Sequence, residues 1–153
     1  MEGKHPVFVG IDVGSVSANI VVLDEHHNVL EEHYMRTKGE PLQTALAGLE
    51  EVVSRYGKDS IKIITATGTG GKLIAPLIGA VFTNEVIAQA KATAVYHPEV
   101  RTVIEMGGQD AKLIIMAEDD EDPEKIRLED FQMNSVCAAG TGSFLDQQAT
   151  RMA

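Results

Sequence analysis

Cysteine and tryptophan are almost absent from this sequence: among 153 residues there is one cysteine, Cys137, and no tryptophan. A single cysteine excludes a disulfide within the chain, which favours a reducing cytoplasm. No apolar run reaches the roughly 18 residues typical of a membrane span, so we expect no membrane segment. The first residues also lack the long apolar stretch of a signal peptide.

Basic residues are scarce as well. The sequence has 13 Lys and Arg against 23 Asp and Glu, a formal net charge of −10. Because nucleic-acid binding depends on clusters of basic side chains at phosphates, we expect no nucleic-acid partner. Part of the acidic excess lies in Glu118–Glu124, which we interpret as a solvated loop, with metal binding as the alternative.

Short apolar runs that end in glycine or turn residues open the chain, and their spacing predicts an α/β protein. Three strands joined by tight turns form a meander, and the apolar period then changes to that of a helix. Pro41 suits the first turn of that helix and Gly57 its end. The predicted elements of this first cycle are strands 7–14, 18–24 and 29–37, a helix over 42–53, a strand over 61–68 and a helix over 84–97.

A second cycle begins at Arg101 with another strand that ends in glycines. Strands over 101–108, 110–119 and 125–134 and a helix from Gly140 repeat the order of three strands and a helix. Such a repeat indicates two similar lobes. We therefore expect a complete first lobe over residues 1–100 and an incomplete second lobe over 101–153.

The first turn of each predicted lobe carries a carboxylate beside small residues, in Ile11–Asn19 and in Met106–Lys112. Glycine lets the backbone approach an anion closely, and successive N–H groups can then donate to phosphate. Asp12 would act through a hydrated Mg²⁺, because two anions do not bind each other directly. Two such turns facing one another would hold the terminal phosphates of a nucleotide.

The alternative is that both are ordinary hairpin turns, since Gly and Asp are common turn residues. Their equivalent places in a repeated topology favour the phosphate interpretation. Two other glycine patterns fail as nucleotide motifs. Ala66–Leu73 lacks the first glycine and the final Ser or Thr of a P-loop, and it lacks the third glycine of the dinucleotide fingerprint.

Five segments carry a resemblance when they are read in order: GIDVGSVSANIVVLD, TATGTGGKLI, TNEVIAQAKA, VIEMGGQDAKLI and NSVCAAGTGSFLDQQA. The sequence resembles the ATPase activators (activases, BadF/BadG/BcrA/BcrD type) of 2-hydroxyacyl-CoA dehydratases and benzoyl-CoA reductases. Those proteins belong to the actin, sugar kinase and Hsp70 superfamily. The resemblance implies an actin-like, ribonuclease H-like ATPase fold. It also implies an activity in anaerobic metabolism, in which ATP hydrolysis drives a low-potential electron onto a CoA-ester dehydratase or reductase.

The resemblance also implies roles for individual residues. The expected cofactors are ATP or ADP, Mg²⁺ and a [4Fe–4S] cluster held between the two subunits of a homodimer, with Cys137 as a cluster ligand. A helix N-terminus would stabilise that thiolate. We assign catalytic roles to Asp12, Gln109 and Asp110, and cofactor binding to Gly14, Ser15, Ser17, Gly107, Gly108, Gly140, Thr141 and Gly142.

The sequence departs from the family pattern at several places. It offers one cysteine where a shared cluster needs two from each subunit, and Asn19 stands where a basic residue is usual. We therefore expect an N-terminal fragment of a longer activator with weak or no ATPase activity alone. Two alternatives remain: a sugar or acyl kinase with Glu85 or Asp110 as base, and a non-catalytic nucleotide-binding or interaction module.

Overall fold

The computed structural model describes residues 5–122, 125–134 and 141–152. The chain forms two compact units, Met1–Asn84 and Glu85–Ala153, which are described here one at a time. The boundary between lobes that the sequence predicts, at residue 100, lies one helix after the boundary between these two units. The helix over Glu85–Tyr96 groups with the second unit because Val86 and Ala90 are buried together with Ile114 and Met116.

The first unit is built on a five-stranded sheet with the order β3-β2-β1-β4-β5. The antiparallel pairs β1–β2 and β2–β3 confirm the predicted meander, and β4 lies parallel to β1 on its other side. Both β1 and β4 therefore end at the same edge of the sheet. The strands are β1 (Val7–Val13), β2 (Ser17–Leu23), β3 (Val29–Arg36), β4 (Ile61–Thr67) and β5 (Val81–Phe82).

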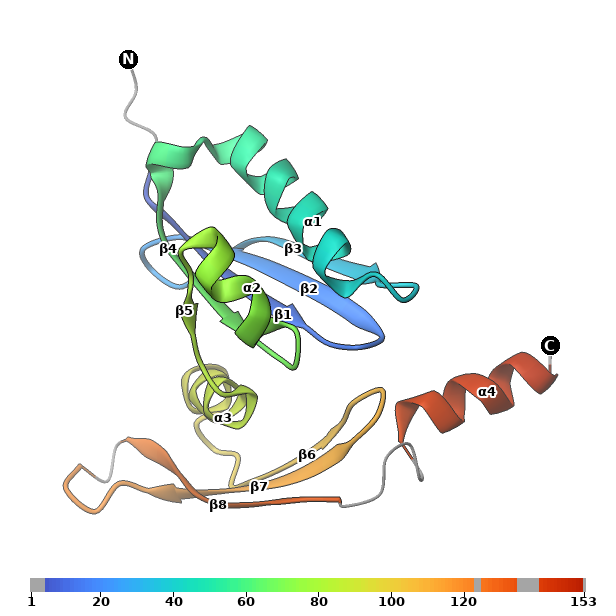
Figure 1. Cartoon of the computed structure of the whole chain (residues 1–153). Helices are drawn as coiled ribbons and strands as arrows, with labels where there is room; N and C mark the ends of the chain where they lie inside the picture. Colours follow the sequence, from blue (N-terminus) through green and yellow to red (C-terminus); the bar gives the residue numbers. More distant parts are fainter. Residues whose placement is uncertain (1–4, 123–124, 135–140, 153) are drawn as a thin grey trace. The chain divides into compact units, whose positions relative to one another are not determined.

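Two helices, α1 (Pro41–Tyr56) and α2 (Gly71–Ile78), cover one face of this sheet (Figure 1). Alternate residues of β1, from Val7 to Val13, point into the core below them. The prediction of α1, with Pro41 in its first turn and Gly57 at its end, is confirmed. The sequence did not predict α2, β5 or the short 3-10 helix over Lys58–Ser60. Glycines and Pro76 mask the short apolar period of α2, and the other two elements are only two or three residues long.

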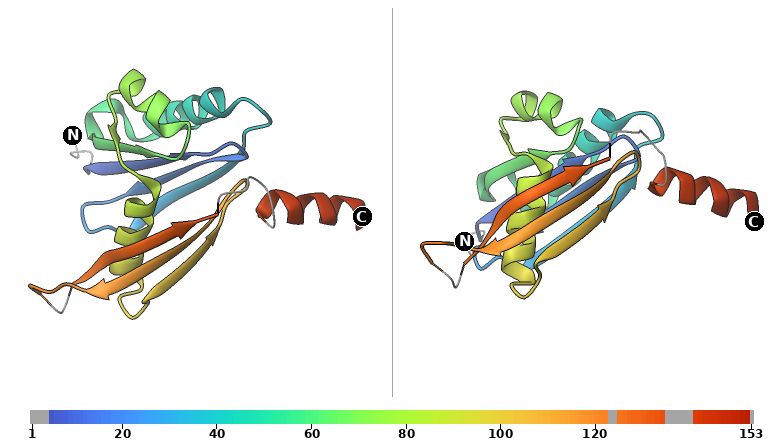
Figure 2. Two further views of the ribbon diagram at one scale, coloured as in Figure 1. Left: turned by 60° about the horizontal axis from the view of Figure 1, so that its bottom comes forward. Right: turned by 90° about the horizontal axis from the view of Figure 1, so that it is seen from below.

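The second unit is an antiparallel sheet of β6 (Thr102–Met106), β7 (Ala111–Glu118) and β8 (Ile126–Met133). Helix α3 (Glu85–Tyr96) packs against β7 and β8, as both views of Figure 2 show. Helix α4 (Gly142–Met152) lies beyond the β6–β7 turn and buries none of its described side chains. The predicted order of three strands followed by a helix is confirmed.

Candidate functional site: two matching turns

The turn between β1 and β2 is closed by a hydrogen bond from Gly14 N to Ser17 O at 2.9 Å. A Cβ atom at Gly14 would lie only 3.2 Å from that same oxygen, so glycine suits this position. The N–H groups of Ser15 and Val16 at its tip donate no hydrogen bond to any residue that the structure describes. This turn therefore presents main-chain donors at the carboxyl end of β1.

Asp12 lies beside this turn at the end of β1 and is paired in register with Asn19 on β2 and with Thr67 on β4. Asn19 Nδ2 donates to Asp12 Oδ2 at 3.3 Å. On the other side the carboxylate is confined by Gly68, where a Cβ atom would lie 2.4 Å from Asp12 Oδ1. The hydroxyl of Thr67 is buried and has no hydrogen-bond partner among the described residues.

The peptide planes of the first turn are held by Thr37, which directly follows β3. Its hydroxyl donates to Ser15 O at 2.7 Å, and its backbone N–H donates to Val16 O at 3.0 Å. The side chain is 3% exposed, so water competes little for these bonds.

The turn between β6 and β7 repeats this arrangement. Gly107 N donates to Asp110 O at 2.9 Å, and a Cβ atom at Gly107 would lie 2.9 Å from Asp110 Oδ1. Within the described ranges, no hydrogen bond is donated by the N–H groups of Gly108, Gln109 and Asp110. The four residues from Gly107 to Asp110 thus match the four from Gly14 to Ser17, position by position.

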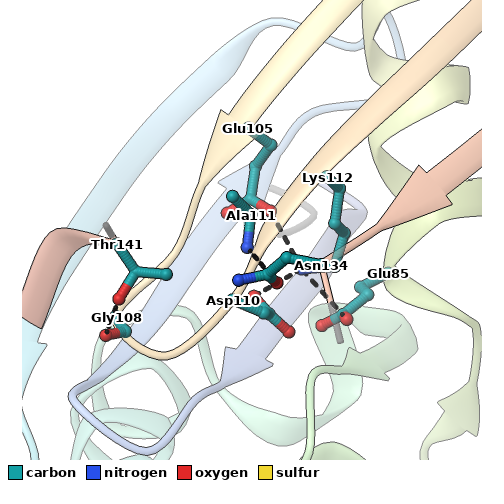
Figure 3. Close-up of polar contacts among 8 residues, drawn as sticks. All are labelled: Glu85, Glu105, Gly108, Asp110, Ala111, Lys112, Asn134 and Thr141. Atoms are coloured by element: carbon teal, nitrogen blue, oxygen red, sulfur yellow. Dashed lines mark hydrogen bonds and ion pairs between the residues drawn. The ribbon is translucent and has the colours of Figure 1, made fainter. Parts of the chain in front are cut away.

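Residues at the start of α4 donate hydrogen bonds to two carbonyl groups of this second turn. Gly142 N donates to Gly107 O at 2.9 Å, and Thr141 Oγ1 donates to Gly108 O at 3.1 Å (Figure 3). Ser143 donates to the same oxygen of Gly108 through both its N–H, at 3.1 Å, and its hydroxyl. Thr141 is fully buried, at 0% exposed.

Three carboxylates surround the ammonium group of Lys112, which is 6% exposed (Figure 3). Lys112 Nζ lies 2.8 Å from Asp110 Oδ1, 2.9 Å from Glu105 Oε2 and 3.3 Å from Glu85 Oε1. Burial alone would lower the pKa of Lys112, but its hydrogen bonds with Asp110 and Glu105 outweigh that effect and raise the pKa. The lysine is therefore charged and ties the second turn to β6 and α3.

The predicted site residues that the structure describes lie in or beside these two turns, each turn within its own unit. Gln109 is exposed at the tip of its turn, whereas Asp110 is held by Lys112. Gly140 and Cys137 lie outside the described residues, so their predicted roles stay predictions. Sequence reasoning missed Thr37 and Lys112. For Thr37 the available signal was its place between the third strand and the next helix of its lobe, which Thr141 also has in the other lobe.

The described residues contain neither a group suited to hold a metal ion nor a helix suited to span a membrane. Within 5–122, 125–134 and 141–152, no three His, Cys, Asp or Glu side chains form a group that could hold a metal ion. In the same ranges no helix has the length and apolar composition needed to cross a membrane. In the acidic run, Asp120 pairs with Arg127 at 3.0 Å and Asp122 pairs with Lys125 at 2.8 Å.

Comparison with known proteins gives one family. The profile of the BadF/BadG/BcrA/BcrD ATPase family matches residues 9–153. An activator of lactoyl-CoA dehydratase from Anaerotignum propionicum is 36% identical over 143 residues, which are 92% of this chain and 52% of that protein. The chain therefore spans about half the length of the curated relatives that it matches.

Solved structures show the same likeness. The activator of the 2-hydroxyisocaproyl-CoA dehydratase from Clostridium difficile with bound ADPNP has a TM-score of 0.79 and 30% identity, covering 95% of this chain and 52% of that one. An ethanolamine utilization protein from Carboxydothermus hydrogenoformans has a TM-score of 0.58 at 15% identity, covering 97% of this chain and 58% of that one, and shows the fold alone. These likenesses confirm the expected actin-like α/β fold.

Proposed function

The chain belongs to the BadF/BadG/BcrA/BcrD ATPase family, and we propose that its two matching turns bind the phosphate groups of ATP or ADP. The observation that carries the proposal is the repeated geometry. In each turn a glycine N–H closes the turn, and N–H groups at the tip have no partner among the described residues. Such unpaired donors bind anions, because phosphate oxygens accept several main-chain hydrogen bonds at once.

The donor set around Asp12 fits a magnesium ion. Its carboxylate lies in the space that glycine leaves at position 68, and the Thr67 hydroxyl is buried nearby without a described partner. Carboxylate and hydroxyl oxygens are the hard ligands that Mg²⁺ prefers, with water in its other positions. When bound, the ion would neutralise phosphate charge. Asp12 would hold its water shell, and Asn19 would keep the carboxylate in place.

Gln109 is suited to orient the water that attacks the terminal phosphate. Its side chain is exposed at the turn and has no partner among the described residues, so its amide can both accept from and donate to a ligand. The neighbouring Asp110 is fixed and neutralised by Lys112 at 2.8 Å. We therefore assign Gln109 to water positioning and Asp110 to the support of its turn.

We propose that in the whole protein this ATPase activity serves a CoA-ester dehydratase or reductase in the cytoplasm. The relatives are named as dehydratase activators, and this supports such a partner. We propose a homodimer that uses ATP hydrolysis to drive electron transfer to that partner.

The chain alone cannot complete the expected [4Fe–4S] cluster. Each copy has a single cysteine, so two copies supply two thiolates where a cluster of this type takes four. We propose that Cys137 contributes one thiolate per subunit and that the other two come from outside this chain. The iron and sulfide content of the whole protein, with and without Cys137→Ser, would test this assignment.

The test of nucleotide binding is calorimetric titration of the chain with Mg·ATP, together with an assay of phosphate release. Asp12→Asn should weaken binding at least tenfold, because it removes the charge that holds the cation. Asp24→Asn is the matched control. Asp24 accepts hydrogen bonds from His26 N, Asn28 N and Asn28 Nδ2 in the β2–β3 turn, and asparagine can keep the two main-chain bonds.

We expect little phosphate release from the chain alone. Absence of any binding by the unaltered chain, or equal effects of the two substitutions, would contradict the proposed role of Asp12.

A further inference from the structure

The carbonyl group of the second residue in each turn accepts a hydrogen bond from a buried threonine hydroxyl. Thr37 donates to Ser15 O at 2.7 Å and Thr141 donates to Gly108 O at 3.1 Å. The two threonines are 3% and 0% exposed. Each lies after the third strand of its unit and before the helix that follows, so the match extends to chain order.

A trans peptide is planar, and its C=O and N–H point in opposite directions. A bond that holds the carbonyl of Ser15 therefore also sets the direction of the Val16 N–H. In the same way the bond to Gly108 O sets the direction of the Gln109 N–H. Both of these N–H groups are without a partner among the described residues, and both occupy the third position of their turns.

We propose that Thr37 and Thr141 are matched positioning residues. Each uses its buried hydroxyl to hold one peptide plane of a turn so that the N–H of the third residue points away from the protein and toward an anionic ligand. The identity of the ligand rests on the proposed function, whereas the orientation of each peptide plane rests on the hydrogen bonds alone. Thr141 thereby acts on phosphate through Gly108 and not by direct contact.

Additional bonds make each arrangement rigid. Thr37 N also holds Val16 O, and Gly142 N and Ser143 N hold the two glycine carbonyls of the second turn. Because glycine permits many backbone conformations, Gly107–Gly108 would otherwise sample several orientations of its peptides. Preorganised donors bind more tightly because the cost of ordering them is met during folding.

The experiment compares Thr37→Val and Thr141→Val with the unaltered chain, since valine keeps the shape of threonine and removes its hydroxyl. Thr37→Ser and Thr141→Ser should restore the behaviour of the unaltered chain. The controls are Thr44→Val and Thr150→Val. These exposed hydroxyls also donate to a backbone carbonyl, at 2.8 Å to Glu40 O and 2.9 Å to Asp146 O.

Two measurements on ¹⁵N-labelled chain separate this inference from the proposed function. The first, without ligand, follows the amide signals of Val16 and Gln109, which should broaden or shift in the matching valine variant only. The second is titration with Mg·tripolyphosphate, which probes the turns without an adenosine group. We expect about tenfold weaker binding in each valine variant and recovery in each serine variant.

Unchanged amide signals and affinity in both valine variants would overturn the inference. If the unaltered chain binds no tripolyphosphate but the valine variants still disturb their own turns, the proposed function fails and the positioning role stands. Because a valine variant could fold poorly, thermal unfolding accompanies each measurement, and the serine variants decide the result where stability is lost.

Discussion

At the scale of single residues, three glycines lie where an added Cβ atom would be crowded. Gly14 and Gly107 close the two turns, and Gly68 gives room to Asp12. The first two were predictable, because Gly and Asp in a short turn after a strand are strong local signals. The role of Gly68 was not, since Gly68 follows β4 and meets Asp12 only because β1 and β4 lie side by side in the sheet.

Gly68→Ala tests this contact. Gly68 has φ +80° and its added Cβ would lie 2.4 Å from Asp12 Oδ1 and 2.7 Å from Val13 O. Left-handed strain and overpacking together should lower the free energy of unfolding by about 2–5 kcal/mol and displace Asp12. Chemical denaturation and Mg·ATP titration would measure the two effects.

The matched control for that substitution is Gly79→Ala, at φ +67° with nothing within 4 Å of the added Cβ. This control should lower the free energy of unfolding only by the backbone strain, about 1–2 kcal/mol, and should leave Mg·ATP affinity unchanged. Equal losses of stability and affinity in the two variants would show that the space beside Asp12 has no importance.

At the scale of elements, Lys112 connects three parts of the second unit. Its ammonium joins β6 through Glu105, the turn through Asp110 and α3 through Glu85. Glu105 and Lys112 are direct partners across the β6–β7 pair, so strand register alone could have predicted their contact. The participation of Glu85 depends on how α3 packs, which periodicity does not specify.

Lys112→Met should destabilise this unit, because it leaves three carboxylates near one another without a cation. Removing one partner of a buried ion pair costs about 3–5 kcal/mol, and the partial exposure of these carboxylates places the loss at the lower end. Hydrogen exchange of the amides in β6 and β7 would report the loss.

The control is Lys125→Met. Lys125 pairs with Asp122 at 2.8 Å but is 75% exposed, so its loss should cost about 0–1 kcal/mol.

The pH dependence of the Lys112 interaction follows from the direction of its pKa. The folded-state pKa of Lys112 is raised, so its contribution is complete below the unfolded value of 10.5 and is lost only as the pH rises through the folded value. The unaltered unit should therefore keep this contribution at neutral pH. Lys112→Met should therefore lower the free energy of unfolding by the same amount at neutral pH and at any higher pH that stays below 10.5. A loss that disappeared within that range would contradict this account.

At the scale of the whole chain, the net charge of −10 opposes the approach of a polyphosphate. Main-chain donors at two turns offset this repulsion only locally. A divalent cation would reduce the charge of the ligand before it reaches the protein. The acidic composition and the carboxylate Asp12 thus both support the proposed Mg²⁺ ion.

Removal of Mg²⁺ should accordingly weaken tripolyphosphate binding at least tenfold. Added salt should reduce this effect of Mg²⁺ removal, because charges more than a Debye length apart are largely screened, about 10 Å at 0.1 M. Titrations with tripolyphosphate in the presence of Mg²⁺ or of EDTA, each at low and high salt, would measure both effects. Equal binding with and without Mg²⁺ would show that the amide groups suffice and that Asp12 has another role.

The sequence alone determined the described strands other than β5, the helices α1, α3 and α4, the repeat and the glycines of both turns, because these depend on local periodicity and turn chemistry. Only the tertiary structure decided which groups hold those turns. Thr37 and Ser15, Thr141 and Gly108, and Lys112 and Glu85 are separated along the chain, and each pair meets only after strands and helices have packed. Hydrogen bonds of this kind depend on positions in space, and neither composition nor spacing encodes them directly.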